Sequence, residues 1–122
     1  MRKSHNFREL IIWKDAMELV QEVYLTTMNL TQEEKFGLKS QMERCAISLP
    51  SNIAEGAGRD TDKDFLRFLN IAMSSSYELE TQLLLAHRLY SIDIEKTLDL
   101  LRAWQLKTGA FIRKIKSDYS PS

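Results

Sequence analysis

Several features are scarce in this chain of 122 residues, and each scarcity excludes a class of protein. A single cysteine, Cys45, rules out a framework of intramolecular disulfides. Four glycines and two prolines leave little room for the turns that separate short strands. Seventeen Lys plus Arg balance seventeen Asp plus Glu, so no net field marks the chain as a polyanion binder. Nucleic-acid binding would therefore need a local patch.

Long apolar runs are also missing near the N-terminus. The longest there is 10–13, which is too short for the core of a signal peptide or for a membrane span. We therefore expect no membrane contact and a cytoplasmic location. Cys45 lies among apolar neighbours with no histidine nearby, which predicts a buried structural thiol and not an activated or metal-bound one.

The chain does have strong helical periodicity. Apolar residues recur every three or four positions, which places them on one side of a helix. In the first segment this stripe consists of Leu10, Trp13, Met17, Val20, Tyr24 and Met28. Similar stripes predict helices over residues 10–28, 32–57, 62–90 and 93–117, in one domain spanning residues 1–122. Because the connections are short, we expect an all-α, antiparallel up-down-up-down four-helix bundle.

Local signals refine the second helix. Thr31 and Glu34 have the spacing of a capping box at its start. Pro50 lies inside it, removes one backbone donor and crowds the carbonyl of Ala46, so helix two is predicted to be kinked at Pro50. Three polar side chains are candidates to satisfy the freed carbonyl: Ser48, Ser51 and Asn52.

The second helix also carries a polar stripe, spaced by three or four positions. Its members are Gln41, Arg44, Ser48, Asn52, Glu55 and Arg59. The third helix has a comparable line: Arg67, Asn70, Ser74 and Glu78. These lines are either solvated faces or a binding surface, and the neighbouring proline favours the second interpretation. The serines at 74–76 predict close packing of the third helix against the second.

Residues suited to catalysis are not arranged for it. His5 precedes the first helix, and His87 lacks the Glu-x-x-His pairing of di-iron bundles. Glu78 and Glu80 are two apart and point to different helix faces. Neither a glycine-rich phosphate loop nor a nucleophile elbow is present. We predict that the protein is no enzyme and has no catalytic residue, cofactor or metal.

Two apolar features suggest association. Residues 10–13 are apolar on every side of a helix turn, and Trp104 adds bulk to the fourth helix. We interpret this excess as an oligomer interface. The alternative is that the N-terminal turn docks across the end of the bundle.

One long, ordered set of motifs resembles a known family. It contains the run Glu34-Lys35-Phe36-Gly37-Leu38-Lys39-Ser40-Gln41, then Arg44, then Ser48-Leu49-Pro50-Ser51-Asn52-Ile53-Ala54-Glu55-Gly56. Further matches are Trp13, Ala16, Arg59, Phe65, Phe68, Leu69, Ala72, Ser75 and 78–81. Nearly the whole chain therefore resembles the 23S rRNA intervening-sequence proteins, a family of four-helix bundles.

The resemblance implies a ring-shaped homo-oligomer, typically a homopentamer. It also implies a relation to accessory proteins of diversity-generating retroelements, which bind nucleic acid and a reverse transcriptase. By position, the family's polar motif falls on Gln41, Arg44, Ser48, Asn52, Glu55, Arg59, Ser75 and Glu78. The chain departs from the family at Glu43, where relatives commonly have a second arginine, and at Ser74, where they commonly have glycine.

Two functional hypotheses follow. The first is a non-catalytic oligomeric accessory protein that binds RNA or DNA through a repeated basic surface, with a protein partner such as a reverse transcriptase. Its phosphate-contacting residues would be Lys39, Arg44, Arg59, Lys63 and Arg67. The alternative is a protein-interaction scaffold without physiological nucleic-acid binding. Zero net charge and three glutamates favour the alternative: Glu43, Glu55 and Glu78.

Overall fold

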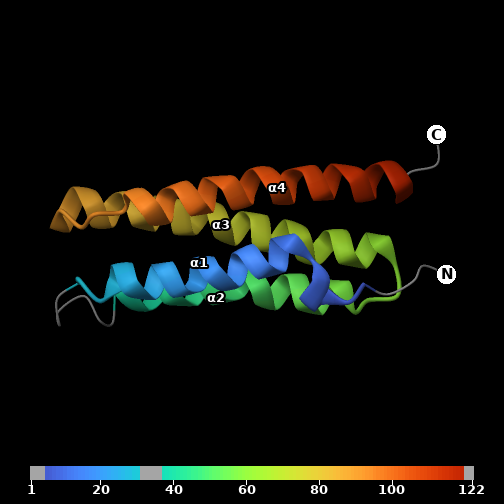
Figure 1. The fold of residues 1–122 in the computed structure, drawn as a ribbon, viewed down its shortest axis with the longest axis horizontal. Helices are drawn as coiled ribbons and strands as arrows, with labels where there is room; N and C mark the ends of the chain where they lie inside the picture. The colour runs from blue at the N-terminus through green and yellow to red at the C-terminus, as the bar shows by residue number, and fades with distance from the viewer. Residues whose placement is uncertain (1–4, 31–36, 120–122) are drawn as a thin grey trace.

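The computed structural model describes residues 5–30 and 37–119 and is all-α in these ranges. A short 3-10 helix, η1 (Phe7–Glu9), precedes four helices. These are α1 (Ile11–Thr27), α2 (Leu38–Ala57), α3 (Asp62–Tyr90) and α4 (Glu95–Tyr119). Figure 1 shows the four helices lying alongside one another, with the chain reversing direction from each helix to the next. The prediction of an all-α four-helix bundle is confirmed.

Contacts between the helices show their order around the core. α1 and α3 each pack against both α2 and α4. The hydroxyls of Thr26 and Thr97 are 2.7 Å apart, and the indole N–H of Trp104 donates to the carbonyl of Ile12 at 2.9 Å. Later residues of α4 thus meet earlier residues of α1, so these two helices run in opposite directions.

The ends of the helices follow from local side chains and backbone. α2 begins at Leu38, because Gly37 has φ −108° and ψ −110° and is not helical. The prediction of a continuous helix over 32–57 is therefore wrong at Gly37, which is not helical. The capping box predicted for Thr31 and Glu34 lies outside the described residues. The Thr61 hydroxyl caps α3 by accepting from the N–H of Asp64 at 3.1 Å. α4 begins at Glu95 and not at residue 93, and the Asp93 carboxylate just before it accepts from the N–H of Glu95 at 3.1 Å.

The buried face of α1 is not the predicted one. Its buried residues are Ile12, Ala16, Leu19, Val23, Thr26 and Thr27. Three residues of the predicted stripe are instead exposed: Met17 (41%), Tyr24 (40%) and Met28 (73%). Apolar side chains occupy two adjacent faces of α1. The face that packs between α2 and α4 has the smaller residues, such as Ala16 and Val23. The other three residues of the stripe, Leu10, Trp13 and Val20, are partly buried and pack against the core. The helical period is therefore right, and the buried face is turned by about one residue from the stripe.

Two further expectations are settled by burial. Trp104 is 1% exposed and adds no surface for association, so the excess inferred for it is wrong. Of residues 10–13, Ile12 is buried, Leu10 and Trp13 pack against the core, and Ile11 is 64% exposed. Most of the N-terminal turn therefore docks on the bundle. Among the described helices, none is long and apolar enough to cross a membrane.

Candidate functional site

The five predicted phosphate-contacting cations fall into two groups. Lys39 and Arg44 lie in the first turns of α2, whereas Arg59, Lys63 and Arg67 surround the turn between α2 and α3. Fifteen residues of mostly helical chain separate Arg44 from Arg59, about 22 Å at the usual rise per residue. One subunit therefore presents two small groups of cations and not a continuous basic patch.

Arg59 and Arg67 converge on one aromatic ring. Their guanidinium carbons lie 4.6 Å and 4.5 Å from the centroid of Phe68, a distance at which cation–π attraction orients the side chain. Each arginine also faces a carboxylate: Glu55 at 4.0 Å from Arg59 and Asp64 at 3.6 Å from Arg67. The two guanidinium groups are positioned well, but each shares its charge with an acidic neighbour.

Lys39 is held in a different way. Its ammonium group pairs with Glu43 at 2.5 Å, and the same carboxylate oxygen accepts from the hydroxyl of Thr27 at 2.7 Å. Glu43, the residue that departs from the family pattern, thus ties α2 to the end of α1. Because the Lys39 side chain is only 22% exposed and already paired, it is a weak candidate for phosphate contact.

The polar residues beside Pro50 bond within α2. The hydroxyl of Ser48 donates to the carbonyl of Cys45, and the amide of Asn52 donates to the carbonyl of Ser48, both at 2.8 Å. Neither bond goes to the carbonyl of Ala46, which Pro50 deprives of its helical donor and which Ser48 and Asn52 were predicted to satisfy. Ser48 and Asn52 therefore support the helix locally, and the kink itself stays a prediction.

Glu78 links α3 to the buried thiol of α2. Burial raises the pKa of Cys45 to about 11, and a hydrogen bond and the charge of Glu78 act in the same direction. The side-chain amide of Gln82 donates to Glu78 at 3.2 Å. The thiol thus stays protonated at neutral pH, as a structural cysteine does. Gln82 was missed, although its spacing of four from Glu78 is a signal for such a pair.

The polar line predicted on the third helix shares one face. A hollow on α3 is lined by Arg67, Asn70, Ile71, Ser74, Ser75 and Glu78. The polar stripe of α2 also contributes exposed side chains: Gln41, Arg44, Glu55 and Arg59. The family's motif residues are therefore surface groups near both ends of α2 and structural groups beside Pro50.

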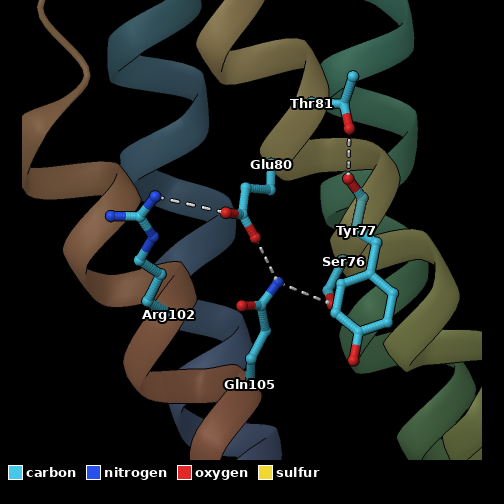
Figure 2. A network of polar contacts seen from close by, with 6 residues as sticks. All are labelled: Ser76, Tyr77, Glu80, Thr81, Arg102 and Gln105. Carbon is cyan, nitrogen blue, oxygen red and sulfur yellow. Dashed lines mark hydrogen bonds and ion pairs between the residues drawn. The ribbon is translucent and has the colours of Figure 1, made fainter.

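The serine run is not a simple packing surface against α2. The amide of Gln105, on α4, donates to the hydroxyl of Ser76 at 3.3 Å and to Glu80 at 3.0 Å (Figure 2). Arg102 contacts the other carboxylate oxygen of Glu80 at 3.5 Å. Ser76 thus faces α4, and this polar network joins α3 to α4. Sequence reasoning missed it because its members lie on two helices.

Groups suited to metal or acid–base chemistry are dispersed. Across residues 5–30 and 37–119, no three His, Cys, Asp or Glu side chains come together in a way that could hold a metal ion. The His87 ring lies 3.1 Å from the carbonyl of Ile92, at the end of α3. The His5 ring lies 5.1 Å from that of Phe65. Both histidines contact the bundle ends.

These observations define a four-helix-bundle protein with polar motifs on α2 and α3. A family model for 23S rRNA-intervening sequence proteins matches residues 8–106, and the chain belongs to this family. It is similar to a protein of unknown function from the S23 ribosomal protein family of Bacteroides thetaiotaomicron VPI-5482. That crystal structure has a TM-score of 0.77 and 23% identity, over 84% of this chain and 96% of that one. No curated protein matches significantly.

Proposed function

We propose that this chain is a non-catalytic, cytoplasmic accessory protein that forms a homo-oligomer and binds RNA or DNA through arginines repeated around the assembly. The observation that carries the proposal is the placement of Arg59 and Arg67 on the ring of Phe68. Guanidinium groups held in place lose less side-chain entropy on binding and suit the planar, bidentate recognition of phosphate.

Repetition of the arginines around an oligomer would compensate for the few phosphate contacts that one subunit can make. Glu55 and Asp64 share the charge of the two arginines, so each subunit supplies one or two phosphate contacts. A pentameric ring would supply roughly five to ten, enough for tight and strongly salt-dependent binding. Nothing on the described surface resembles a base-reading module, so the binding should depend little on sequence.

Exposed apolar side chains support the assembly. A groove between α1 and α2 is lined by Trp13, Met17, Val20, Ile47, Pro50, Ser51 and Ala54. Met17 and Ile47 are 41% and 45% exposed, and contiguous apolar surface of this kind marks association sites. We place a subunit contact along this groove, whose lining residues do not include Arg59 or Arg67.

The experiment is a titration of nucleic-acid-free protein into labelled structured RNA and duplex DNA at about 50 and 200 mM salt, where counterion release separates ionic binding from none. Arg59→Ala and Arg67→Ala should each weaken binding several-fold and reduce its salt dependence. Arg44→Ala tests the other group of cations. Arg88→Ala, an exposed arginine near the far end of α3, is the matched control and should change little.

A second candidate function has its own support. Lys39, Arg59 and Arg67 each lie within 4.0 Å of a carboxylate, which favours a scaffold that binds proteins, a reverse transcriptase among the candidates. Absence of RNA and DNA binding even at about 50 mM salt would overturn the first proposal and leave this one.

A further inference from the structure

One face of α4 is apolar although it points away from the core. Leu101, Trp104, Thr108, Ile112 and Ile115 form its buried side. On the opposite side, Ala103, Leu106 and Ala110 are exposed and recur every three or four residues, so they form one stripe. Leu106 is 76% exposed, more than any other large apolar side chain that the structure describes.

The stripe borders a groove formed with the N-terminal part of the chain. The groove between α4 and the start of α1 is lined by Glu9, Leu10, Ile11, Ile12, Lys107, Ala110, Phe111 and Lys114. Ile11, which is 64% exposed, extends the apolar surface on the α1 side. Small side chains at Ala103 and Ala110 allow the backbone of a further helix to come close to α4.

Cations border this surface on both sides. Lys107 and Lys114 line the groove, and Arg102 and Arg113 follow the other edge of the stripe. Lys107 bonds to Asp15 at 2.8 Å and Arg102 to Glu80 at 3.5 Å, so part of this charge is compensated. Over the whole of α4, six Lys and Arg stand against three carboxylates, Glu95, Asp99 and Asp118, and Glu9 also lines the groove. Residues 102–116 nevertheless hold five basic side chains and no acidic one, so the excess of positive charge borders the apolar stripe.

We propose that this α4 stripe, Ala103, Leu106 and Ala110 with Ile11 beside it, docks an amphipathic helix of a partner protein whose apolar ridge is bordered by Asp and Glu. Apolar anchors at i, i+3 and i+7 suit a helix laid along a groove, and the bordering lysines select its charge. A nucleic acid would leave Leu106 without an apolar partner. None of its residues is among the cations proposed to contact nucleic acid, so the peptide test can fail while the RNA proposal stands, and the reverse.

The test uses a labelled helical peptide of about 16 residues, long enough to run beside 102–116, with leucine every third or fourth position and glutamate on both sides. A matched peptide has lysine in place of each glutamate. Fluorescence anisotropy should show binding of the glutamate peptide at least tenfold tighter than of the lysine peptide. Leu106→Ser should weaken it about tenfold, and Lys114→Glu should shift the preference toward the lysine peptide. Leu89→Ser and Arg88→Glu, on exposed residues near the far end of α3, should change neither.

Each other result overturns the proposal. Three results would show that the stripe is no docking site for an acidic helix. They are equal affinity for the two peptides, no binding of either peptide, and an affinity that Leu106→Ser leaves unchanged. Release of monomers by Leu106→Ser in the absence of peptide would assign the stripe to a second copy of this chain. Loss of RNA binding on Lys114→Glu, but not on Leu106→Ser, would assign it to phosphates. Circular dichroism of each variant verifies the fold.

Discussion

Asn52 shows how a motif residue can serve the fold. Its amide donates to the carbonyl of Ser48 inside α2, two residues after Pro50. From sequence, Ser48, Ser51 and Asn52 were the candidates to satisfy the carbonyl of Ala46 that Pro50 frees. Ser48 and Asn52 instead bond the carbonyls of Cys45 and Ser48, because the choice of acceptor depends on rotamers that the packing of α2 against α1 and α3 selects.

Asn52→Ala should destabilise the protein by about 1 kcal/mol, because the substitution removes a partly buried hydrogen bond next to an already weakened helix turn. Urea unfolding followed by circular dichroism measures this. RNA affinity should stay within about twofold of the wild type, since the side chain bonds its own helix. Gln21→Ala, at an exposed position of α1, is the control. An unchanged melting temperature for Asn52→Ala would contradict this structural role.

Cys45 should react slowly in the native protein. Burial first, and then Glu78, raises its pKa from the ordinary 9.0 to about 11, so at pH 8 the thiolate fraction is roughly a hundredfold lower than in the unfolded chain. Iodoacetamide labelling with and without urea measures the difference. Glu78→Gln should speed native labelling, because it removes one cause of the raised pKa. Equal labelling rates in native and unfolded protein would contradict this.

The same shift has a consequence for stability. Because the folded state raises the pKa of this thiol, its contribution is fully present below pH 9 and is lost as the pH rises toward about 11. Urea unfolding at pH 8 and pH 10.5 should show a lower free energy of unfolding at the higher pH. The free energy of unfolding of Cys45→Ala should fall less between these two pH values. An equal fall would show that other groups are responsible.

At the scale of the elements, α2 and α3 approach each other closely at Gly56. A Cβ added to Gly56 would lie 2.8 Å from Cδ1 of Phe65 and 2.8 Å from Cβ of Phe68. This glycine therefore permits the helix crossing that also positions Arg59 and Arg67. From sequence, Gly56 indicated the end of the second helix, and nothing in the local pattern showed that Phe65 and Phe68 would pack against it.

Gly56→Ala should destabilise the bundle by about 1–3 kcal/mol, because overpacking outweighs the helix propensity that alanine gains. The matched control is Gly109→Ala in α4, where the nearest atom to the new Cβ is the flexible end of Arg113 at 3.4 Å. There the same substitution should be stabilising by about 0.5–1 kcal/mol. Thermal melts of both variants measure the contrast, and a Gly56→Ala protein as stable as Gly109→Ala would refute the close contact.

Sequence periodicity predicted the number and kind of elements better than their faces. Each segment of regular apolar spacing became a helix, since amphipathicity is a local property. The buried face of α1 could not be chosen in the same way. Ala16 and Val23 are buried in place of Met17 and Tyr24, because two neighbouring helices must pack against the buried face of α1. That fit is a property of the assembled core and not of the local sequence.

At the scale of the whole molecule, the residues that line the apolar groove between α1 and α2 include none of the candidate cations. A subunit contact in that groove therefore need not use the arginines at the turn between α2 and α3. The candidate cations could be chosen from sequence. The pairing of Lys39, Arg59 and Arg67 with Glu43, Glu55 and Asp64 was missed, although spacings of three and four along a helix are a signal for such pairs. At these three cations the charge is balanced locally.

The double variant Met17→Glu, Ile47→Glu should dissociate the homo-oligomer, because it places two charges in the apolar groove between α1 and α2. Light scattering behind size-exclusion chromatography should report an oligomer for the wild type and a monomer for the variant. Leu89→Glu, at an exposed apolar position on α3 outside the groove, is the control and should stay assembled. A wild type that is monomeric at micromolar concentration would contradict the assembly.

The most direct measurement of the central claim is the salt dependence of RNA affinity for the wild type beside that monomeric variant. If arginines repeated around an assembly bind phosphates, the logarithm of affinity should fall several-fold more steeply with the logarithm of salt concentration for the oligomer, since the slope scales with the number of phosphates neutralised. Arg59→Ala in the oligomer should make this slope shallower. Equal slopes for oligomer and monomer, or no RNA binding by either, would contradict the account.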